Sequence, residues 1–170
     1  MLSDRYTKPY QRRFVMEHKQ KVIDYLNMLL ADEFLAQNQY LIHSEMYLDW
    51  GYKKLYERIK GEVADEAEHS RQLIQRILIL GGVVNVKEFR FTIGTDVPSM
   101  LRSDLALELK VRDNLKKGIV LCEQERDFAT REMILGQLRD TEEDHAYWLE
   151  QQLRLIDSLG LENYLQYAAM

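Results

Sequence analysis

The sequence predicts an all-α protein: a four-helix up-down bundle with one long crossover and a short fifth helix at the C-terminus. Three observations support this fold class. The 170 residues include only 2 Pro and 8 Gly, so long stretches carry few helix breakers. Apolar residues recur every three or four positions along four of these stretches, which is the spacing of a buried helix face. One connection, residues 83–97, is long enough to let the helix after it run parallel to the helix before it.

Local signals set the limits of each expected helix. Asp49-Trp50-Gly51 interrupts the first periodic stretch, so the second helix should fold back antiparallel to the first. Gly81-Gly82 is typical of a helix C-terminus. Asp96 is expected to cap the third helix, with Pro98 in its first turn, and Gly160 separates the fourth helix from the short fifth. The four long helices are therefore expected over residues 19–48, 52–80, 96–127 and 129–158.

The chain divides into a basic N-terminal extension (1–18), the four-helix bundle (19–158) and the short C-terminal helix (159–170). The extension carries Lys and Arg with no apolar run between them, which argues against a secretory signal. Met16 begins a stretch that reads as a domain start. We therefore expect residues 1–15 to be either a basic arm or the product of an over-called start codon.

Composition narrows the function classes. The net charge of −5, from 23 basic and 28 acidic residues, argues against a nucleic-acid partner. A single cysteine, Cys122, excludes an intramolecular disulfide and a Cys-rich zinc or iron–sulfur site. No apolar run approaches the ~20 residues of a membrane span. We expect a cytoplasmic protein with neither nucleic-acid nor membrane partners.

Each predicted inward face is apolar except for a carboxylate, or a carboxylate and a histidine, near its middle. The first and third helices each offer one glutamate, and the second and fourth each offer a Glu-x-x-His pair, whose members share a helix face. These residues are Glu33, Glu66, His69, Glu108, Glu142 and His145. Burying several ionised carboxylates together is very costly unless a positive charge lies among them, and no Lys or Arg occupies these central positions. The donor set suits two hard or borderline cations such as iron or manganese.

The spacing supports one shared level in the bundle. Glu33 and Glu66 are 33 residues apart, and Glu108 and Glu142 are 34 apart. The alternative is that both Glu-x-x-His pairs are polar contacts on solvated faces. Tyr40, two turns after Glu33, is either an electron donor to the site or a core residue. Glu62, one turn before Glu66, faces either the edge of the site or the interior of an assembly.

Several segments of the chain match a known family. They are Lys21–Asn27, Asn38–Tyr40, Met100–Glu108, Asp140–His145 and Gly160–Gln166. Over about residues 16–166 the chain resembles the bacterioferritins and their haem-free relatives among bacterial ferritins. The resemblance implies an iron-storage ferroxidase, which oxidises Fe²⁺ with O₂ or H₂O₂ at a di-iron site within each subunit. It also implies a hollow homo-oligomeric shell of 24 subunits in which ferric mineral is stored.

In the family pattern, Glu33 and His69 would bind one iron, and Glu108 and His145 the other. Glu66 and Glu142 would bridge the two ions, and Tyr40 matches a family tyrosine near the site.

The chain departs from the family pattern at the haem site. The methionine that holds haem b at a two-fold interface is replaced by Ala67, so haem is not expected at the usual site of a homo-oligomer. This suggests co-assembly with a haem-binding sibling subunit, while iron release would use a ferredoxin-type reductant.

Three other functions remain open from the sequence. The chain could be a structural shell subunit whose site only admits iron, or a di-iron peroxidase that stores no mineral. A DNA-protecting mini-ferritin fits less well, because metal sites in that group lie between subunits. The sequence leaves open whether O₂ or H₂O₂ is the oxidant and whether the iron pair stays in place or passes into the cavity.

Overall fold

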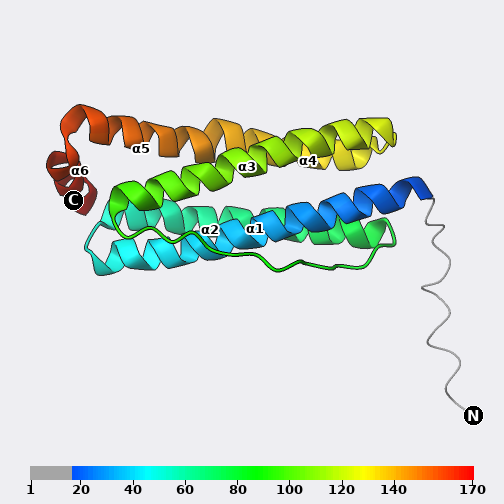
Figure 1. The fold of residues 1–170 in the computed structure, drawn as a ribbon, viewed down its shortest axis with the longest axis horizontal. Coiled ribbons are helices and arrows are strands. Elements are labelled where there is room, and N and C mark those ends of the chain that lie inside the picture. Colours follow the sequence, from blue (N-terminus) through cyan, green and yellow to red (C-terminus); the bar gives the residue numbers. More distant parts are fainter. Residues whose placement is uncertain (1–16) are drawn as a thin grey trace, which may run out of the picture.

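The computed structural model describes residues 17–170, which form a helical bundle with no strand among them (Figure 1). The elements are α1 (Glu17–Asp49), α2 (Lys53–Ile79), α3 (Val97–Gln124), α4 (Phe128–Asp140), the π-helical segment η2 (Thr141–His145), α5 (Ala146–Leu159) and α6 (Leu161–Ala169). Together α4, η2 and α5 make the fourth long helix, and α6 lies at the same end of the bundle as the α1–α2 turn (Figure 1). The predicted all-α bundle with one crossover and a short fifth helix is confirmed.

The helix ends follow the expected local chemistry. Gly51, Gly81 and Gly160 have φ values of 81°, 82° and 78°, a left-handed backbone that glycine adopts without a steric penalty. The Asp96 side chain accepts a hydrogen bond from the backbone N–H of Ser99 in a capping box at the start of α3. These turns lie where the sequence placed them because their signals are local.

Several helix bounds differ from the prediction, most of them by one residue, and three differences have a structural consequence. Helix α1 begins at Glu17, so the last two residues of the predicted extension are helical, while residues 1–16 lie outside the described part of the chain. Helix α3 ends at Gln124, before the expected residue 127, because Arg126 adopts a left-handed φ of 56° and breaks the helical path. The fourth long helix starts at Phe128 and contains a π-helical turn rather than a continuous α-helix.

The crossover between α2 and α3 runs along the bundle and is fastened to α1 (Figure 1). Thr92 N–H donates to Gln39 Oε1 at 3.1 Å, and Gly94 N–H donates to His43 Nε2 at 3.3 Å. Fully buried His43 in turn holds Asp104 of α3, with His43 Nδ1 2.8 Å from Asp104 Oδ1. The crossover is therefore positioned by a buried polar cluster rather than by its own secondary structure.

The inward faces largely match the sequence pattern. On the first two helices, the predicted inward residues Glu33, Tyr40, Glu62, Glu66 and His69 are all buried. On α3 the structure buries Asp104 completely and leaves Leu105 only partly covered, since Asp104 is paired with His43 and Gln39. Within residues 17–170, none of the helices combines the length and apolar character needed to cross a membrane.

Candidate metal centre

A buried cluster of carboxylates and imidazoles lies midway along the bundle. Glu33 comes from α1, Glu66 and His69 from α2, Glu108 from α3, and His145 from the end of η2, and all five are buried. Their ligand atoms form two groups, and the atoms of each group all lie within 4.8 Å of one another. One group is Glu33, Glu66 and His69, and the other is Glu66, Glu108 and His145. Because Glu66 belongs to both groups, the geometry fits two cations that share one carboxylate.

The two oxygens of Glu66 face different histidines. Its Oε2 lies 3.1 Å from His69 Nδ1, and its Oε1 lies 3.0 Å from His145 Nδ1. Glu33 Oε2 lies 3.7 Å from His69 Nδ1 on one side, and Glu108 Oε1 lies 3.6 Å from His145 Nδ1 on the other. Both imidazoles therefore direct Nδ1 toward the centre, with one terminal carboxylate beside each.

Several buried atoms of this cluster make no hydrogen bond. They include both carboxylate oxygens of Glu33 and Glu108 Oε2. Buried oxygens and ring nitrogens are rarely left without a partner, because desolvating them costs about 1–3 kcal/mol each. Free lone pairs that converge in a buried site are the donor set that a metal cation requires, so these residues fit iron or manganese.

Protons compensate the carboxylates when no cation is bound. Burial and the neighbouring Glu66 charge raise the pKa of Glu33 well above its ordinary value, and burial likewise raises the pKa of Glu108. Burial opposes charge on His69, but contacts with Glu33 and Glu66 outweigh it and raise the pKa of His69 to about 11. The pKa of His145 is raised in the same way by Glu108, Glu62 and Glu66, against burial. Both shifts favour the protonated imidazoles, and cations entering the site would displace these protons.

The structure does not bring Glu142, the sixth predicted ligand, to this cluster. Its side chain is 38% exposed and pairs with Lys116 Nζ at 2.5 Å. Glu142 lies within the π-helical segment η2, which takes one residue more per turn than an α-helix, so the face that it shares with His145 differs from the one expected for a regular α-helix. Thr141, rather than Glu142, shares the buried face of His145.

Tyr40 lies directly beside the cluster. Its side chain is fully buried, and its hydroxyl donates a hydrogen bond to Glu108 Oε1. Burial and the charge of Glu108 raise the pKa of Tyr40 well above its ordinary value, so the phenol keeps its proton. Tyr40 is therefore a buried core residue that also contacts a candidate ligand, and its role as an electron donor stays a prediction.

The outer nitrogens of the two histidines also face carboxylates. His145 Nε2 lies 2.7 Å from Glu62 Oε2, and His69 Nε2 lies 3.2 Å from Asp140 Oδ2. Of the two positions left open for Glu62, the structure gives the edge of the site. Periodicity could place Glu62 on the inward face, but its contact with His145 depends on how α2 and η2 pack.

Comparison with known proteins shows which family the chain resembles. A family profile described as "Ferritin-like domain" matches residues 23–159. A bacterial ferritin of Pseudomonas aeruginosa is 55% identical over 151 residues, and one of Neisseria meningitidis is 52% identical over 151; each alignment spans 89% of this chain and 98% of the relative. A bacterioferritin of Mycolicibacterium paratuberculosis is 38% identical over 150 residues, 88% of this chain and 94% of the relative. The matched region contains every residue of the metal centre.

Proposed function

This chain belongs to the ferritin-like family, and from that premise we propose that it is an iron-storage ferroxidase. It oxidises Fe²⁺ at the centre within each subunit and stores the ferric product in a hollow shell of 24 copies. The single observation that carries the proposal is the position of Glu66, whose two oxygens each face one imidazole while the flanking carboxylates keep unpaired buried oxygens.

Fe²⁺ is the substrate of this reaction. Glu33 and His69 would hold one ion, Glu108 and His145 the other, with Glu66 between them. The imidazoles lose their Nδ1 protons as the ions bind, so two displaced protons offset part of the incoming charge. Oxidation removes one electron from each of two Fe²⁺ ions. The pair of electrons and two protons convert O₂ to H₂O₂, or H₂O₂ to two water molecules.

Glu142 is proposed as a ligand of the iron-loaded state alone. To reach the centre its carboxylate must leave Lys116 and turn inward on the π-helical segment. The exposed ion pair with Lys116 is worth no more than about 1 kcal/mol, so it does not prevent this movement. Tyr40 is proposed as an electron donor to the site, since its hydroxyl contacts Glu108.

The remaining proposals concern partners and haem. Ala67 offers no lone pair to iron, so the homo-oligomer is proposed to bind no haem b at the usual site, and haem would enter only with a haem-binding sibling subunit. A ferredoxin-type reductant would release the stored iron in the cytoplasm. The purified shell of this chain alone should show no Soret absorption when it is expressed with haem supplied, and haem bound in stoichiometric amounts would contradict this.

Stopped-flow oxidation of Fe²⁺ tests the ferroxidase. Glu66→Ala should abolish the fast phase at two ions per subunit, because it removes the carboxylate common to both groups. Glu68→Ala is the matched control: it removes an exposed glutamate of the same helix that pairs with Arg71, and it should keep the wild-type rate. An unchanged fast phase in Glu66→Ala would reject the catalytic centre.

Iron loading then separates storage from detoxification. Assembled shells should take up far more iron than the two ions that each centre can hold. Loading that stops at the centres would favour a di-iron peroxidase.

A further inference from the structure

Arg58 of α2 joins two carboxylates that are far apart in the sequence. Its Nη2 lies 2.6 Å from Glu62 Oε1, one turn along α2, and 2.7 Å from Asp144 Oδ1 in η2. The other oxygen of Glu62 lies 2.7 Å from His145 Nε2. A continuous chain of charged groups thus runs from Arg58 through Glu62 to the outer edge of the metal centre.

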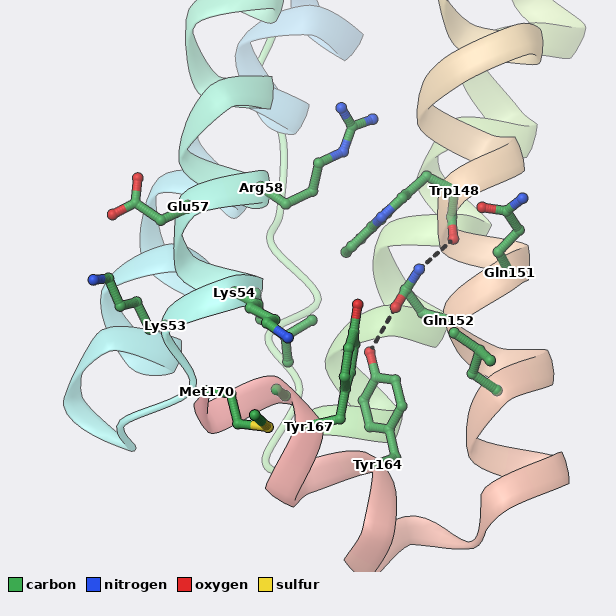
Figure 2. Close-up of a pocket in the computed structure, with 13 residues that line it drawn as sticks. Lys53, Lys54, Glu57, Arg58, Trp148, Gln151, Gln152, Tyr164, Tyr167 and Met170 are labelled. Atoms are coloured by element: carbon green, nitrogen blue, oxygen red, sulfur yellow. Dashed lines mark hydrogen bonds between the residues drawn. The ribbon is translucent and has the colours of Figure 1, made fainter.

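The surroundings restrict where Arg58 can go. Its guanidinium lies 5.3 Å from the ring of Trp148 on α5, within range of a cation–π contact. Figure 2 shows both side chains at one side of a cavity between α2, α5 and α6, which has a volume of about 750 Å³. Arg58 is 30% exposed, while the Glu62 side chain is only 4% exposed. The arginine therefore stands between the open cavity and a buried carboxylate.

A carboxylate next to Nε2 of His145 would help this histidine to bind a cation through Nδ1. Nδ1 must offer a lone pair to a cation beside Glu66 and Glu108, so the remaining proton must stay on Nε2. An ionised acceptor next to Nε2 favours that tautomer, fixes the plane of the ring and makes Nδ1 more basic. Glu62 is the group that lies in this place.

We propose that Glu62 is a positioning residue for His145, and that Arg58, held by Asp144 and Trp148, fixes the Glu62 carboxylate against Nε2. This inference rests on the proposed metal centre and adds a mechanism for orienting one of its ligands. The two histidines of the centre differ in the carboxylate that lies next to their outer nitrogen. His69 has Asp140 at its outer nitrogen, but the Asp140 side chain is 61% exposed and 3.2 Å away. The cation position beside His145 therefore depends on its outer carboxylate more than the position beside His69 does.

Equilibrium binding of Co²⁺ to the assembled, metal-free protein tests this, because it requires no turnover and Co²⁺ reports its ligands by visible absorption. Wild-type protein should bind Co²⁺ in two steps per subunit. Glu62→Ala should weaken one step by about 10–100-fold and shift its absorption bands, while the other step keeps its affinity. Glu62→Gln retains an acceptor oxygen and should restore part of the loss. Arg58→Met should weaken the same step to a smaller extent.

Controls separate positioning from general damage. Arg71→Met removes another arginine of α2 that pairs with a glutamate, Glu68, and should change neither step. Two unchanged steps in Glu62→Ala, or two steps weakened equally, would overturn the positioning role. An unchanged or strengthened step in Arg58→Met would overturn the part assigned to Arg58. Wild-type protein that binds no Co²⁺ would overturn the metal centre itself, and this inference with it.

Discussion

Neighbouring carboxylates on α1 should respond in opposite ways to neutralisation. Glu33 and Asp32 are both buried, at 1% and 6% exposure. Asp32 accepts hydrogen bonds from Lys110 Nζ and Asn114 Nδ2, each at 2.7 Å, whereas neither carboxylate oxygen of Glu33 makes a hydrogen bond. Replacing each carboxylate by its amide changes the charge with almost no change in shape. Glu33→Gln should stabilise the metal-free fold, and Asp32→Asn should destabilise it.

The expected changes in the free energy of unfolding follow from the hydrogen-bond partners of each carboxylate. A buried polar group without a hydrogen bond costs about 1–3 kcal/mol, and the repulsion between Glu33 and Glu66 adds to it, while the attraction between Glu33 and His69 offsets part of it, so Glu33→Gln should recover about 1 kcal/mol, at the low end of that range. Asp32→Asn weakens contacts worth roughly 1 kcal/mol, since Lys110 is 55% exposed and its charge is screened by water. For a chain of this size each kcal/mol shifts the melting temperature by about 2–4 °C.

The assay is thermal unfolding of chelator-stripped shells, followed by calorimetry and repeated with Zn²⁺ present. Without metal, Glu33→Gln should melt above wild type and Asp32→Asn below it. With Zn²⁺ the order of wild type and Glu33→Gln should reverse, because the variant lacks a ligand and gains less from binding. A metal-free Glu33→Gln protein that melts at or below the wild-type temperature would refute the argument that Glu33 is tolerated for the sake of a cation.

Three further outcomes are expected. Against the effect of burial, two neighbouring carboxylates raise the pKa of His69 to about 11, so the metal-free fold should lose stability as the pH rises from about 6.5 to 11; melting temperatures that stay level across that range would contradict this. A Cβ at Gly94 would lie 2.4 Å from Met100 N, so Gly94→Ala should cost at least about 1–3 kcal/mol, while Gly136→Ala, with open space in the middle of α4, should gain about 0.5–1 kcal/mol in denaturant titrations. Glu142→Gln should change metal-free stability by less than about 0.5 kcal/mol yet reduce retained iron; a large stability loss with normal iron uptake would assign Glu142 a structural role.

Short local sequence signals predicted most of the helix ends, and with them most of the fold. Asp96 caps α3 and Gly81 ends α2 as expected, because capping and left-handed turns depend on a few adjacent residues. The buried cluster of Gln39, His43 and Asp104 was not predicted, although the Tyr40, His43, Tyr47 spacing continues the inward face of the first helix. Whether such residues find partners depends on the neighbouring helix, which the periodicity of one helix does not describe.

The amino-acid sequence by itself predicted six donors that share a face and a level, from a spacing of three or four residues within each helix, and the structure gathers five of them: Glu33, Glu66, His69, Glu108 and His145. Only the tertiary structure decided which groups complete the centre. Within the π-helical segment η2, Thr141 and His145 are buried, whereas Glu142 is exposed and pairs with Lys116. The link from Arg58 to Asp144 spans 86 residues of sequence. Side-chain contacts between helices depend on how the helices pack. Helical periodicity describes one helix at a time, so it does not predict which side chains of two helices come into contact.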